Sequence, residues 1–75
     1  MVKIKGTRDY IDVYIDDKVV RIPGEMVHGG FIAEKGGIRV WKEPEGKPIT
    51  AEEREEIMKS VIDKTSGSHM VITFE

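Results

Sequence analysis

Residues 10–22 read YIDVYIDDKVVRI, and this stretch carries the clearest structural pattern of the chain. In its first half every second residue is a β-branched apolar one, which is the pattern of a strand with one buried face. If Asp16-Asp17 forms a two-residue turn, the register pairs Ile15 with Lys18, Val13 with Val20 and Ile11 with Ile22. This register makes one face of the hairpin apolar, so the turn and the hydrophobic pattern agree.

A second hairpin is predicted after a break at Pro23-Gly24, because proline cannot donate to a strand ladder. Gly24-Glu25 is interpreted as part of that turn. The second hairpin would run over residues 31–35 and 38–42, with Gly36-Gly37 as its turn. Its register would place Glu34 opposite Arg39 and Ile32 opposite Trp41, two favourable cross-strand pairs.

The strongest helix signal follows the polar loop of residues 42–48. Thr50 and Glu53 have the spacing of a capping box, and they predict a helix over residues 51–64 that stops near Gly67. An apolar stripe would lay the helix on the sheet, and it consists of Ile57, Met58, Val61 and Ile62.

The chain closes with residues 70–75, a final strand in which Met70, Ile72 and Phe74 share one face. The predicted fold class is therefore α+β. We expect an antiparallel β-sheet meander of about five strands, with one α-helix before the C-terminal strand packed on one face. At 75 residues the chain has room for one core, so residues 1–75 are interpreted as a single domain.

The composition is that of an ordinary cytoplasmic domain. Twelve basic and fourteen acidic residues give a formal net charge of −2, which implies neither nucleic acid nor a membrane as partner. The N-terminal residues resemble no signal peptide, and no long apolar run is present. The lack of cysteine suits a reducing compartment.

No catalytic apparatus is visible. Nucleophilic catalysis needs a base and an orienting group, yet the chain has no cysteine and only two histidines, His28 and His69, both in predicted loops. Their spacing matches no metal-ligand motif, and no phosphate or dinucleotide fingerprint occurs. We expect no enzyme activity, no metal and no cofactor.

Acidic residues gather around the predicted helix start, and they have two interpretations. The first is a solvated first turn stabilised by the helix dipole. The second is a surface that faces a basic partner. The candidates for that surface are Glu43, Glu45, Glu52, Glu53 and Glu56.

Three aromatic residues are further candidates for partner binding. Trp41 suits either a core or an interface, and coverage by Ile32 favours the core. Tyr10 and Tyr14 point away from the apolar face of the first hairpin and would mark a contact surface if the helix covers only one face.

Several short stretches, in their order along the chain, resemble the Immunity protein 74 family of bacterial polymorphic toxin systems. They are GTRDYI at 6–11, VRIPGE at 20–25, Gly30-Phe31, Trp41 with Pro44, PITAEE at 48–53 and ITFE at 72–75. The turn Asp16-Asp17 and residues 67–70 depart from the family pattern.

The resemblance implies an immunity protein that binds and neutralises a cognate protein toxin by stoichiometric occlusion, with no active-site residues. Two alternatives remain. One is a generic protein-binding or self-associating module, including a homodimer. The other is a small enzyme or ligand carrier, which would require a pocket around Trp41.

Overall fold

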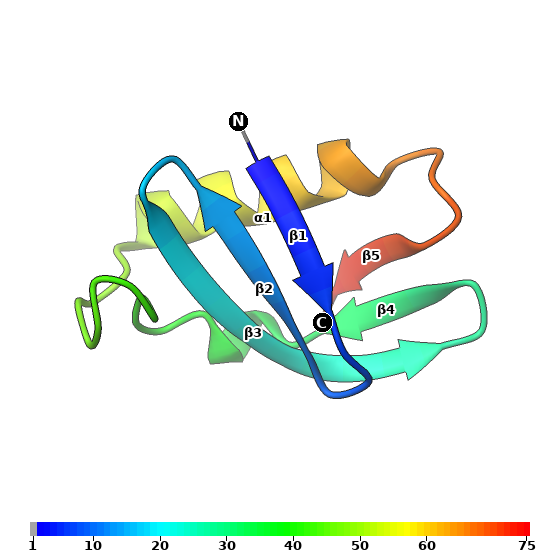
Figure 1. Ribbon diagram of the computed structural model, residues 1–75, viewed down its shortest axis with the longest axis horizontal. Coiled ribbons are helices and arrows are strands. Elements are labelled where there is room, and N and C mark those ends of the chain that lie inside the picture. Colours follow the sequence, from blue (N-terminus) through cyan, green and yellow to red (C-terminus); the bar gives the residue numbers. More distant parts are fainter. Residues whose placement is uncertain (1) are drawn as a thin grey trace.

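The computed structural model describes residues 2–75 and contains one sheet and one long helix (Figure 1). The elements in chain order are β1 Val2–Gly6, β2 Tyr10–Ile15, β3 Lys18–Val27, β4 Gly30–Ala33, the short 3-10 helix η1 Lys35–Gly37, α1 Ala51–Thr65 and β5 Val71–Phe74. The five strands lie in sequence order in a curled sheet, and α1 crosses one of its faces. The α+β class and the number of strands are as predicted.

The first hairpin has the predicted register. β2 and β3 are antiparallel, with Ile15 opposite Lys18, Val13 opposite Val20 and Ile11 opposite Ile22. Asp16, in the turn between them, has a positive φ. Aspartate tolerates this conformation better than most residues do, and a two-residue hairpin turn needs it.

The predicted break at Pro23-Gly24 is wrong, because β3 continues through it and changes partner there. Pro23 is the last residue opposite β2, and Gly24 is the first opposite β4. The Pro23 carbonyl still accepts a hydrogen bond from the Glu34 N–H at 2.8 Å. A Cβ at Gly24 would collide with the Ile32 carbonyl and the Phe31 ring, so this glycine permits close packing and is not a turn residue.

The predicted second hairpin is also wrong. The chain turns instead at His28-Gly29, between β3 and β4, where Gly29 has a positive φ. The expected turn at Gly36-Gly37 is part of η1, and neither Glu34–Arg39 nor Ile32–Trp41 is a cross-strand pair. A glycine pair resembles a hairpin turn locally, but β4 finds its partner in the second half of β3.

The sheet is mixed, which corrects the prediction of a purely antiparallel meander. β5 pairs parallel with β4, with Phe31 opposite Ile72 and Ala33 opposite Phe74. Parallel neighbours need a long crossover, and the connection through α1 provides it. β1 pairs antiparallel with β2 and was not predicted, whereas residues 38–42 were predicted as a strand and form none. Five strands were therefore expected, but one of them was assigned to a different segment.

The region before α1 is an irregular loop that completes the pairing of β3. Its Glu43 carbonyl accepts from the Val19 N–H at 2.9 Å, on the first part of β3, where β4 does not extend. The loop leads into Thr50, whose hydroxyl accepts from Glu53 N–H at 3.1 Å while Glu53 Oε1 accepts from Thr50 N–H at 2.9 Å. The predicted capping box is confirmed, and the helix ends at Thr65, before Gly67.

The core lies between α1 and the concave face of the sheet. Of the predicted helix stripe, Ile57 and Val61 are buried and Met58 is half-buried, whereas Ile62 is exposed. Trp41 is buried, as predicted, although it does not lie opposite Ile32. Each fully buried side chain of this kind contributes roughly 1.5–3 kcal/mol of transfer free energy.

Within residues 2–75 no helix combines the length and the apolar character needed to cross a bilayer.

Candidate functional site

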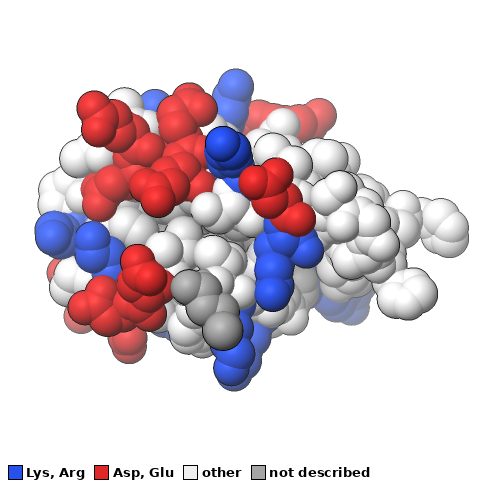
Figure 2. All heavy atoms as spheres, turned by 90° about the horizontal axis from the view of Figure 1, so that it is seen from above, with Lys and Arg blue, Asp and Glu red and all other residues white. Residues whose placement is uncertain are grey.

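Several predicted acidic candidates lie at one end of the molecule, where α1 begins beside the β2–β3 turn. Glu53 and Glu56 line a small cavity together with Asp16 and Lys18, over a floor of Ile15, Trp41 and Ile57. Figure 2 shows acidic side chains gathered over the first part of α1 and, separately, at the neighbouring hairpin turn. We call Glu43, Glu45, Glu52, Glu53 and Glu56 the acidic end.

Within the acidic end, Glu53 has a structural role. Its carboxylate closes the capping box and lies 3.5 Å from Lys18 Nζ. The hydrogen bond from the Thr50 backbone N–H is the main reason that the pKa of Glu53 is lowered, and Lys18 adds to the effect. Glu53 is therefore partly engaged by its own chain.

Glu52 and Glu56 are exposed on α1, whereas Glu53 is half-buried. Glu43 and Glu45 are exposed on the preceding loop, which lies at the same end of the molecule as the start of α1 (Figure 1). The loop and the start of α1 lie at the same end because the loop leads directly into Thr50.

Trp41 is the floor of this end and contributes little surface to it, since only 3% of the residue is exposed. Lys18 Nζ lies 5.2 Å from the centre of the indole, within the range of a cation–π contact. The cavity above has a volume of about 100 Å³. Small-molecule sites usually begin at about 300 Å³. The cavity over Trp41 is therefore smaller than an ordinary small-molecule site.

The two tyrosine candidates lie elsewhere, on the convex face of the sheet. The Arg21 guanidinium lies 3.9 Å from the centre of the Tyr10 ring, and Lys5 Nζ lies 5.7 Å from that of Tyr14. Both tyrosines are half-buried. The structure therefore does not bring them together with the acidic end, because α1 covers the opposite face of β2.

Asp12, between these tyrosines, was not identified from the sequence. It is buried, and its carboxylate accepts hydrogen bonds from Arg21 Nε at 2.8 Å and Arg21 Nη2 at 3.0 Å. Lys42 Nζ forms a salt bridge with the same carboxylate at 3.6 Å. The hydrogen bonds from Arg21 are the largest cause of the lowered pKa of this carboxyl. The signal was present in the hairpin register, which places Asp12 opposite Arg21.

The histidines lie apart from these groups. His28 is exposed in the β3–β4 turn and His69 is exposed after α1. Within residues 2–75 no three histidine, aspartate or glutamate side chains gather to hold a metal.

Together, the helix start and the loop before it give this small α+β protein one end that is rich in exposed carboxylates. The family model described as Immunity protein 74 matches residues 3–75, essentially the whole chain. The chain belongs to this family, as its sequence resemblance indicated, and membership implies a toxin as partner and a non-enzymatic, inhibitory role. No curated protein and no solved structure matches the chain.

Proposed function

We propose that this chain neutralises one cognate bacterial polymorphic toxin in the cytoplasm by binding it in a stoichiometric complex. The observation that carries the proposal is the family match, which extends over residues 3–75. An immunity protein of this kind acts through its interface alone, and specificity then depends on contacts that fit one toxin and reject others.

The acidic end is the proposed contact surface. Its exposed carboxylates, Glu52 and Glu56, project from a capped helix whose position is fixed by the buried Ile57. A toxin with a basic substrate cleft would be attracted over a distance by such a surface, and the same contact would close the cleft.

Co-expression with the product of the adjacent gene tests the proposal. We expect restored growth, a complex that survives purification, and one toxin for each copy of this chain by light scattering. If the product of the adjacent gene stays toxic and forms no complex, it is not the partner of this chain and the proposal fails.

A mismatched toxin from another polymorphic system serves as the control. Rescue should be confined to the cognate toxin, because stoichiometric inhibition depends on interface complementarity and not on a general effect on growth.

A further inference from the structure

A second surface lies between β5 and α1, from Glu55 onward along the helix. It is a groove of about 520 Å³. Its apolar lining comes from Met58, Ile62, Val71, Ile72 and Phe74, and its charged lining from Glu55, Lys59 and Asp63. Ile62 and Val71 are both exposed, so apolar area is open to solvent here.

The floor of the groove is the free edge of the sheet. Among the strands of residues 2–75, β5 is the last in the sheet order, with β4 on one side only. Val71 N–H donates to the Gly29 carbonyl and Glu75 N–H to the Ala33 carbonyl. Because backbone groups alternate along a strand, those of Ile72 and Phe74 point away from β4.

One of these outward groups is already satisfied. Ile72 N–H donates to Thr65 Oγ1 at 3.2 Å, which fixes the start of β5 to the end of α1. The Ile72 carbonyl and both backbone groups of Phe74 remain on the open side, where a further strand would find a donor and two acceptors.

The two edges of the sheet differ in how they are protected. β1, at the opposite edge, carries Lys3 and Lys5, and charged side chains of this kind discourage pairing with another chain. β5 reads VITF and has no charged residue between Val71 and Phe74. The edge without this protection is the one beside the apolar groove.

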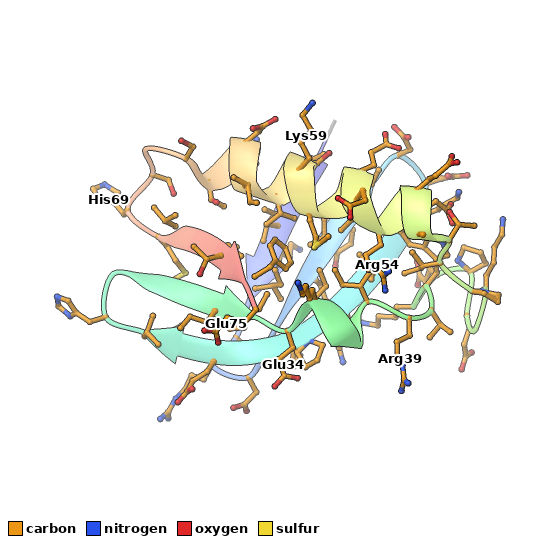
Figure 3. All side chains as sticks on the ribbon, turned by 180° about the vertical axis from the view of Figure 1, so that it is seen from behind. Glu34, Arg39, Arg54, Lys59, His69 and Glu75 are labelled. Atoms are coloured by element: carbon orange, nitrogen blue, oxygen red, sulfur yellow. The ribbon has the colours of Figure 1, made fainter. Side chains whose placement is uncertain are left out.

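We propose that the groove binds an extended segment of a partner protein, which adds a sixth strand beside β5. The backbone of the segment would pair with Ile72 and Phe74, and apolar side chains at alternate positions would enter the groove between β5 and α1. Basic residues would flank the segment, since two of the three charged lining residues, Glu55 and Asp63, are acidic, and the side chain of the third, Lys59, extends away from β5 (Figure 3).

A foreign segment fits this site better than a second copy of the chain does. The β5 edge of a second copy has its own α1 beside it, so two helices would compete for the space above the paired strands. A two-fold arrangement would also place Glu55 of one copy near Asp63 of the other, a repulsive pairing of like charges.

Capped peptides of about eight residues, an ordinary strand length, test the proposal without any toxin. The pool has lysine at each end and apolar residues alternating with threonine between them. We expect amide NMR shifts on the intact chain at Ile72, Phe74 and Ile62, and little change on β1. No shift at these residues with the pool at millimolar concentration would overturn the proposal.

Backbone pairing is separated from simple apolar contact by a matched peptide. N-methylation of alternate amides keeps the side chains but removes the donors that face β5. Loss of the NMR shifts supports strand addition, whereas equal binding by the methylated peptide contradicts it.

Two variants locate the site on the chain. Ile62→Glu should weaken peptide binding about tenfold or more, because it places a charge on the groove wall. Val40→Glu, at an exposed residue outside the groove, should leave binding unchanged. Equal effects of both variants, or a concentration-dependent dimer that Ile62→Glu abolishes, would overturn the assignment to a foreign segment.

Discussion

The two halves of α1 differ in chemistry although they belong to one rigid helix. The first half stands beside the β2–β3 turn over a cavity of about 100 Å³ lined by carboxylates and Lys18. The second half faces β5 across an apolar groove of about 520 Å³. Charge acts over a distance and sets association rates, whereas apolar area and backbone pairing act only on contact. One helix thus presents two chemically different surfaces, one charged and one mainly apolar.

Truncation of Ile57 should remove the support of the first half of α1, because this side chain is buried beneath it. Ile57→Ala should lower the free energy of unfolding by about 2–5 kcal/mol, through lost transfer energy and a residual cavity. Urea denaturation measures the change. Ile62→Ala, on the exposed groove wall, is the control and should cost about 1 kcal/mol or less.

Asp12 differs from the carboxylates of the acidic end, because it lies on the other face of the sheet and is bound by Arg21 of its own chain. Asp12→Asn should lower the free energy of unfolding by about 1.5–3 kcal/mol at neutral pH, since it weakens two charged hydrogen bonds to Arg21. Association with the toxin should be unchanged. A variant as stable as the original chain at neutral pH would show that the ion pair adds nothing net.

The pH dependence of the Asp12 effect has a definite sign. The folded pKa of Asp12 lies below the ordinary value of 3.8, so the contribution of the ion pair is complete above that value. It is lost as the pH falls through the lower, folded pKa. Chemical denaturation at a series of pH values should therefore show the original chain and Asp12→Asn differing at neutral pH and converging in acid.

Charge reversal tests whether the acidic end attracts the toxin. The double variant Glu52→Lys, Glu56→Lys should slow association about tenfold at low salt and weaken its salt dependence. Stopped-flow mixing with the toxin measures both. Glu53 is left unchanged in this variant because it closes the capping box, and its reversal would also disturb the helix.

A second acidic surface supplies the matched control for this reversal. Glu25 and Glu34 line a shallow pocket with Asp9 and Glu75, away from the start of α1. The double variant Glu25→Lys, Glu34→Lys changes the net charge equally and should leave the charge-dependent part of association at the acidic end intact. If this control slows association more than the reversal at the acidic end does, the toxin contacts the second surface instead.

The capping box is the smallest of the expected effects. Thr50→Ala should cost about 1 kcal/mol, because it leaves the Glu53 N–H without its side-chain acceptor. Thermal unfolding followed by circular dichroism measures the loss. Glu53→Gln should cost less stability, since an amide oxygen can still accept from Thr50 N–H. A loss of stability as large as that of Thr50→Ala would show that the charge of Glu53 provides the stabilisation.

Sequence patterns predicted those parts of the molecule that local rules govern. The first hairpin has its predicted register because turn length and alternation both act within one short stretch, residues 10–22. α1 begins where predicted because Thr50 and Glu53 satisfy each other's backbone. The acidic residues at the start of α1 could be selected as binding candidates because the helix start itself was predictable. Their role in binding stays a prediction.

The errors arose where pairing is not local. Gly36-Gly37 looked like a turn and Pro23-Gly24 like a break, but β3 is long enough to pair with β2 along its first part and with β4 along its second. β1 was overlooked since its short alternation lacks a turn signal as strong as that of the first hairpin. The groove beside β5 could not be foreseen either, because it depends on how far α1 stands from the last strand.

The sequence alone determined the α+β class, the first hairpin, the capped helix and the resemblance to the Immunity protein 74 family. Each rests on residues close together in the chain or on an ordered set of short stretches. The parallel pairing of β5, the burial of Asp12 and the separation of the tyrosines from the acidic end emerge only in the tertiary structure. These features depend on which face α1 covers and where the crossover returns, and that is settled by packing the whole chain around one core.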